Sequence, residues 1–146
     1  MKSLLCVIFS LMSLIIQAQT IILDSSNLPI CIIDTRGKTI ANEPKILAHM
    51  KIIYNGPGKT NSVKDLKYNY NNFIAIEIRG NSSQSYPQKQ YGIEFRDSVT
   101  GNDLDTSILD MPKEEDWILY APYNDISLLR NVMTYHFWNE MGHWGP

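Results

Sequence analysis

Apolar side chains alternate with polar ones along much of this chain, and the alternation predicts β-strands. Between residues 45 and 54 the apolar positions fall on every second residue, while Lys45, His49 and Lys51 share the other face. Successive side chains of a strand point to opposite faces of a sheet, so this strand is expected to be half exposed. Apolar runs that are bounded by turn residues predict strands at 28–35, 45–54, 72–80, 89–95 and 116–122.

The pattern changes to helical spacing near the C-terminal end. Apolar residues recur every three or four positions between 124 and 142, where Asn124 or Asp125 can cap the helix start and Gly142 can end it. The strands precede this helix, and residues 55–72 between them are expected to form a loop. The predicted fold class is therefore α+β: an antiparallel sheet of about five strands with one long C-terminal helix against it.

The first residues of the chain look like an export signal and not like part of the fold. Lys2 precedes an apolar run over 4–16, and small and polar residues follow it, so residues 1–19 are predicted to be a signal peptide. The alternative is an N-terminal membrane anchor, but the run is short for a span. We expect a protein that is secreted or located in the cell envelope, with no stable membrane span after cleavage.

Composition narrows the function classes further. A net charge of −2 over 146 residues argues against a nucleic-acid partner, which would require a concentrated basic face. Cys6 lies in the predicted signal peptide, so Cys31 is the one cysteine expected in the mature protein, without an internal disulfide. Because Cys31 lies in an apolar strand without a nearby basic residue, a buried and inert thiol is expected.

Several patterns that suggest chemistry have plainer explanations. The Gly-Lys-Thr of residues 58–60 lacks the first glycine of a phosphate-binding loop, since Ile53 stands there, and no apolar helix follows, so a turn is predicted. The three histidines lack the spacing of zinc ligands, and the acids 114–116 are typical of a solvated turn. No metal-binding residue is predicted.

Lys89 is the exception among the polar residues. Along the strand 89–95 it is in phase with Tyr91, Ile93 and Phe95, so it points to the sheet's interior. An ammonium group taken out of water is costly unless it meets an anion. Periodicity leaves two anions open, a structural carboxylate or the phosphate of a ligand. Because Lys89 begins the strand, its ammonium group could instead reach water.

Four motifs, in order, resemble the N-terminal portion of the CotH family of secreted, kinase-like proteins. They are an Arg-Gly-x-Ser-Ser turn, a proline-lysine strand entry, a Met-Pro-x-x-x-Asp-Trp segment and a Tyr-x-Asp-x-x-x-x-Arg-Asn helix start. The matching residues are Arg79, Gly80, Ser82, Ser83, Pro87, Lys89, Tyr91, Met111, Pro112, Asp116, Trp117, Tyr123, Asp125, Arg130 and Asn131. The resemblance places a partial kinase-like domain at 73–146, with an N-terminal β region and loop at 20–72.

The resemblance implies the small lobe of an atypical protein kinase, which transfers phosphate from ATP, with Mg²⁺, to serines of a protein substrate. It implies that Lys89 contacts the phosphates, that Ser82 and Ser83 lie in the turn that covers them beside Arg79, and that Arg130 belongs to the positioning helix. The first lysine of the family's Lys-Lys pair is Gln88 here. We assign the contact to Lys89, because strand phase turns it inward.

The family's metal-binding and catalytic carboxylates are expected to lie beyond Pro146. No catalytic residue is therefore predicted in this fragment, which alone is expected to be inactive, because phosphoryl transfer depends on positioning and charge neutralisation. The alternative hypothesis is a non-catalytic secreted or cell-surface interaction module that keeps the β scaffold without turnover.

Overall fold

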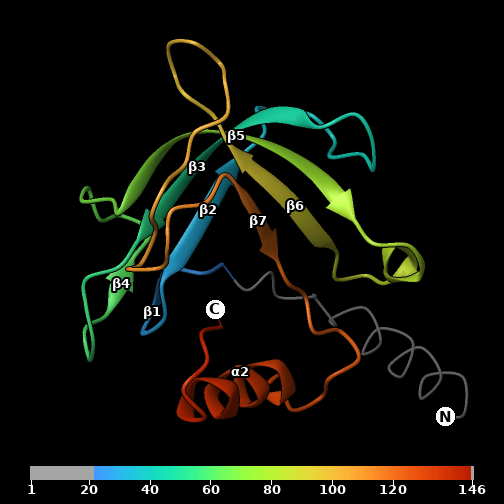
Figure 1. The fold of residues 1–146 in the computed structure, drawn as a ribbon. Helices are drawn as coiled ribbons and strands as arrows, with labels where there is room; N and C mark the ends of the chain where they lie inside the picture. The colour runs from blue at the N-terminus through green and yellow to red at the C-terminus, as the bar shows by residue number, and fades with distance from the viewer. Residues whose placement is uncertain (1–21, 146) are drawn as a thin grey trace, which may run out of the picture.

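The structure of the chain is a computed structural model that describes residues 22–145. Its main element is an antiparallel sheet with the strand order β2-β3-β5-β6-β7. These strands span Ile30–Asp34, Ile46–Ile53, Tyr70–Arg79, Gln90–Phe95 and Asp116–Leu119. Figure 1 shows a strongly curved sheet, with the helix α2 (Arg130–Glu140) lying apart from it. The α+β class and the five predicted strands are confirmed.

The predicted loop 55–72 contributes one strand to a second, very small sheet, and its last residues belong to β5, which begins at Tyr70. β4 (Asn61–Ser62) pairs with β1 (Ser25–Ser26). Asn61 is fully buried, and its side chain joins two segments by accepting a hydrogen bond from the Asn55 N–H (2.7 Å) and donating one to the Leu28 carbonyl (2.8 Å). The Gly-Lys-Thr segment forms a turn, as predicted, in which the Lys59 N–H donates to the Gly56 carbonyl.

The core lies on one face of the large sheet. Alternate residues of β3, β5 and β6 supply it, and Ile74, Ile76 and Phe95 have no exposed surface. The loop after β6 closes over this face: Ile108 is buried in the core, and Leu104 and Met111 pack against it. Burial of this apolar surface is the main favourable term in folding.

The helix does not cover the sheet, so this part of the prediction was wrong. Every residue of α2 is solvent-exposed, including the apolar Met133 and Phe137. The physical reason is that the loop carrying Ile108 already occupies the core face of the sheet. Among the residues that the structure describes, no helix is long and apolar enough to cross a membrane.

The prediction that Cys31 is buried was also wrong. It lies on β2, at the edge of the sheet, and is exposed instead of buried. Nearby protein atoms nevertheless raise the pKa of its thiol by desolvation, which disfavours the reactive thiolate. The predicted signal peptide, residues 1–19, lies outside the described residues, and the boundary between 72 and 73 stays a prediction. The large sheet itself crosses that boundary, since β3 pairs with β5.

Asp125 organises the start of α2, although the helix begins five residues later. Its carboxylate accepts hydrogen bonds from the Ser127 hydroxyl (2.6 Å), the Ser127 N–H (3.1 Å) and the Arg130 N–H (2.8 Å). Asp125 thus accepts a hydrogen bond from the first free N–H of the helix, as predicted, but the N-cap residue is Leu129 and the helix is shorter than the predicted 124–142. The hydrogen bond from Ser127, and then the N–H groups and the charge of Arg130, lower the pKa of the Asp125 carboxyl.

We therefore expect Asp125→Asn to change how stability depends on pH. A lowered pKa means that the carboxylate stabilises the fold above its ordinary pKa of 3.8, and that this contribution is lost as pH falls through the folded value. Unfolding followed by circular dichroism from about pH 7 to about pH 2 should show lower stability at neutral pH and a shallower acid loss than in the parent protein. Asp110→Asn, at an exposed loop position, is the control. Identical pH profiles for Asp125→Asn and the parent would contradict this role.

Candidate functional site

The connection between β5 and β6 forms a compact turn at the positions of the predicted phosphate-covering segment. Ser82–Ser85 make a single turn of 3₁₀ helix, η2, closed by a hydrogen bond from the Ser85 hydroxyl to the Ser82 carbonyl (2.7 Å). The Gln84 side-chain amide donates to the Asn42 side chain (2.6 Å) and to the Gly80 carbonyl. These bonds tie η2 to the β2–β3 connection, so the turn has a defined position at the end of the sheet.

Gly80 allows this turn to form. Its φ of +107° lies in a region that favours glycine, and a Cβ atom there would be 2.0 Å from the Ser83 Oγ. The Ser83 side chain therefore packs directly over the Gly80 backbone. Ser82 is exposed on the outer surface of the turn. Both predicted serines thus belong to η2.

Lys89 reaches back to the same turn. It is half-buried, and its Nζ donates a hydrogen bond to the Gln84 carbonyl at 2.5 Å. Tyr91, Ile93 and Phe95 lie on the core face, as the strand phase predicted. Within residues 22–145, no carboxylate lies at ion-pair distance from Lys89. Its partner is a neutral carbonyl, so the structural ion pair that the sequence left open is not formed in the described part of the chain.

Arg79 lies elsewhere. It is the last residue of β5, is paired with Gln90, and lines a cleft of about 700 Å³ where β6 and β7 face α2. Four aromatic side chains, Trp117, Tyr120, Tyr135 and Trp144, also line this cleft. Lys89 does not line it, which accords with strand alternation: Lys89 and the adjacent Gln90 point to opposite sides.

Arg130 belongs neither to the residues around η2 nor to the cleft that Arg79 lines. Its side chain is 81% exposed, and its Nε lies 3.5 Å from the Asp125 carboxylate. The adjacent Asn131 lines the cleft instead. The structure therefore brings Lys89, Ser82 and Ser83 together around η2, and it places Arg79 and Arg130 outside this group. Their predicted contact with a nucleotide stays a prediction.

Tyr86 connects η2 with the segment that leads into α2. Its ring stacks on that of Tyr123, with centroids 5.0 Å apart, and its hydroxyl accepts a hydrogen bond from the Asn124 amide (2.7 Å). Asn124 immediately precedes Asp125, which organises the helix start. Two aromatic rings thus link the turn to the segment that leads into the helix. Tyr86 and the first helical residue, Arg130, are 44 positions apart in the sequence.

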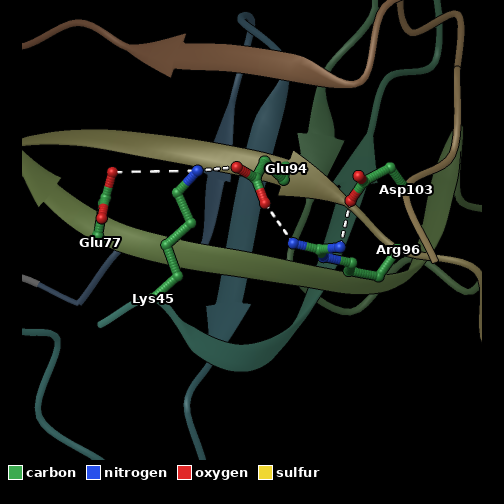
Figure 2. Close-up of polar contacts among 5 residues, drawn as sticks. All are labelled: Lys45, Glu77, Glu94, Arg96 and Asp103. Atoms are coloured by element: carbon green, nitrogen blue, oxygen red, sulfur yellow. Dashed lines mark hydrogen bonds and ion pairs between the residues drawn. The ribbon is translucent and has the colours of Figure 1, made fainter. Parts of the chain in front are cut away.

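An ion network on the sheet face opposite the core, shown in Figure 2, was not predicted from the sequence. Glu94 of β6 pairs with Lys45, just before β3, and with Arg96, just after β6. Arg96 also pairs with Asp103, and the Lys45 Nζ lies 4.0 Å from the Glu77 carboxylate of β5. The network spans three neighbouring strands.

Alternation placed Glu77 and Glu94 on the outward face, but it could not pair them with a cation. The register does so, because Ile46 pairs with Ile76 and brings Lys45 beside Glu77. Gly92, opposite Glu77, leaves space there, and a Cβ atom on Gly92 would meet the Glu77 carboxylate at 3.6 Å. A strand register is set by long-range pairing, so no local pattern in one segment would have found this network.

The acids at the entrance of β7 lie close to other acidic residues. Glu114 and Asp116 are exposed, and no group of three metal-ligating side chains gathers anywhere in residues 22–145. Desolvation, and then repulsion from Asp103, Asp105 and Asp116, raise the pKa of Glu115.

Comparison with known proteins finds a family match over the segment that carries this site. Residues 76–146, just under half of the chain, match the family model described as CotH kinase protein. This match confirms the resemblance carried by the motifs, and it suggests a kinase-like function at the level of the family. A search of curated proteins and a search of solved structures each found no significant match.

The geometry of η2 predicts that Gly80→Ala destabilises the protein. The substitution forces a side chain into a positive-φ conformation and against Ser83, so we expect a loss of about 1–3 kcal/mol in the free energy of unfolding. Chemical denaturation measures it. Gly92→Ala is the matched control, because its Cβ would make only ordinary contacts. Equal effects of the two substitutions would show that the turn does not depend on Gly80.

The ion network makes a separate prediction. Glu94→Gln should lower the free energy of unfolding by about 1–2 kcal/mol, because two partly buried cations lose their shared carboxylate. Partial solvent exposure keeps the expected loss below that of a fully buried pair. Glu140→Gln, at an exposed position on α2, is the control. A loss for Glu94→Gln no larger than that of the control would show that the network contributes nothing measurable.

Proposed function

We propose that residues 76–145 form part of the nucleotide-binding lobe of a serine protein kinase-like protein, and that the phosphates of ATP bind between Lys89 and η2. The resemblance implies ATP with Mg²⁺ as the phosphate source and an exported protein with serines as the acceptor. Export through the N-terminal segment belongs to the same proposal. The match to the CotH family supports the reaction class.

One observation carries the proposal: the ammonium of Lys89 lies half-buried against a turn without an ion-pair partner in the described residues. A neutral carbonyl satisfies one donor of the ammonium group, which has three. A phosphate oxygen is a stronger acceptor, since charge-assisted hydrogen bonds are about twice as strong as neutral ones. An anionic ligand would therefore supply the counter-charge that the described part of the fold does not.

The turn fits a covering role because it is small, polar and fixed. Its serine hydroxyls are suited to phosphate oxygens, and the bonds of Gln84 to Asn42 and Gly80 hold it in place beside Lys89. Mg²⁺ fits less well. It takes oxygen ligands, usually carboxylates, and no group of three metal-ligating side chains is found among residues 22–145. We assign no metal ligand and no catalytic step to these residues.

Lys89→Ala tests the proposal directly. Isothermal titration of the purified chain with ATP should show binding that the substitution weakens by roughly tenfold or more, the expected cost of one charge-assisted hydrogen bond. Lys59→Ala is the matched control, because Lys59 lies in the Gly-Lys-Thr turn and is exposed. Thermal unfolding of both variants checks that they remain folded.

Undiminished ATP binding by Lys89→Ala would refute the assignment of this lysine. Equal weakening by Lys59→Ala would show that ATP responds only to the overall charge. Failure of the unmodified chain to bind ATP would favour the non-catalytic interaction module instead.

A further inference from the structure

A separate cavity lies on the sheet face opposite the core, away from η2 and outside the segment that matches the family. It has a volume of about 450 Å³ and is formed by β2, β3 and the segment that follows β4. We call it the β2–β3 cavity. Its lining residues are Ile32, Asp34, Arg36, His49, Lys51, Val63 and Tyr68.

The strand register gathers these side chains. Asp34 pairs with His49, and Ile32 pairs with Lys51, so four of the lining residues project from adjacent positions of two strands. Arg36 joins them from the turn that follows β2. The cavity is therefore built on paired strands, which fix its floor more firmly than a loop would.

Positive charge exceeds negative charge in this cavity. Arg36 and Lys51 carry two fixed positive charges, whereas Asp34 carries one negative charge. The Asp34 carboxylate is already engaged by the backbone N–H of Arg36, at 2.8 Å. No carboxylate lies at ion-pair distance from Arg36 or Lys51 within the described residues. Both cations are thus available to an anion.

Neighbouring aromatic rings position the basic side chains. The Lys51 Nζ lies 5.0 Å from the centroid of the Tyr68 ring, a cation–π contact that keeps the ammonium at the cavity wall. His49 meets Phe73 edge to face, with centroids 5.4 Å apart. Ile32 and Val63 add an apolar surface to the same cavity. A ligand that fits this cavity would therefore carry both a negative charge and an apolar part.

We propose that the β2–β3 cavity binds a small organic oxyanion, a carboxylate or phosphate group attached to an apolar body. Arg36 and Lys51 bind the anionic group. Guanidinium and ammonium groups are the usual protein partners of such oxygens. Ile32, Val63 and the Tyr68 ring contact the apolar part. This site is independent of the nucleotide site proposed at Lys89.

Amide shifts in ¹H–¹⁵N NMR spectra test the site with three probes: phenyl phosphate, inorganic phosphate and benzyl alcohol. Phenyl phosphate should give saturable shifts centred on Asp34, His49 and Lys51. Inorganic phosphate should shift the same amides, but only at several-fold higher concentration because it lacks the apolar part. Benzyl alcohol, which has no charge, should cause no such shifts. Absence of saturable shifts with phenyl phosphate would overturn the proposal, and equal affinity for the two phosphates would refute the apolar contact.

Lys51→Gln should weaken phenyl phosphate binding roughly fivefold, as expected for one partly exposed ion pair. Arg36→Asn is the second variant, because asparagine tolerates the positive φ of 53° at this position. Lys64→Gln is the control, since Lys64 is exposed and pairs with Asp24 outside the cavity. If Lys64→Gln weakened phenyl phosphate binding equally, the effect would come from overall charge alone, and the proposed site would be overturned. Because binding is read from the amides of Asp34, His49 and Lys51, phosphate bound at Lys89 does not enter this measurement, and the two proposals fail independently.

Discussion

The pairing of β5 with both of its neighbours is the constraint on which the rest of the structure depends. This ten-residue strand lies at the centre of the sheet, with β3 on one side and β6 on the other. Ile74 and Ile76 are completely buried on its core face, while Glu77 and Arg79 project from its other face. A shift of one residue in register would exchange these two sets, placing isoleucines in water and charges in the core. The register is thus determined by both faces at once.

The two faces of the sheet carry different features. The core face is closed by the loop that carries Ile108, and Lys89 extends this face to the turn η2. The opposite face carries the Glu94 ion network near one end of β3 and the β2–β3 cavity near the other. In the network, cations and carboxylates compensate each other, and this suits a stabilising role. At Lys89 and in the β2–β3 cavity the cations lack such partners in the described chain, and this suits ligand binding. The contrast separates the proposed sites from structural ion pairs.

Local patterns predicted the strands well, because alternation and turn residues are properties of single segments. The inward phase of Lys89, the turn at the Gly-Lys-Thr sequence and the capping by Asp125 were also accessible in this way. Three features were not. Cys31 is exposed because its strand lies at the sheet edge, and α2 is exposed because a loop already fills the position expected for the helix. The pairing of Lys45 with Glu94 depends on strands that are distant in sequence. Each of these depends on which segments become neighbours, and periodicity within one segment carries no information about that.

The link through Tyr86 has a consequence for the placement of α2. Since α2 buries no residue of its own, its direction is set mainly by the segment that leads into it, where Tyr123 and Asn124 hold the ring and hydroxyl of Tyr86. Tyr86 in turn directly follows η2. The two tyrosines therefore join η2 to the segment that leads into α2 by a direct stacking contact, outside the paired strands of the sheet.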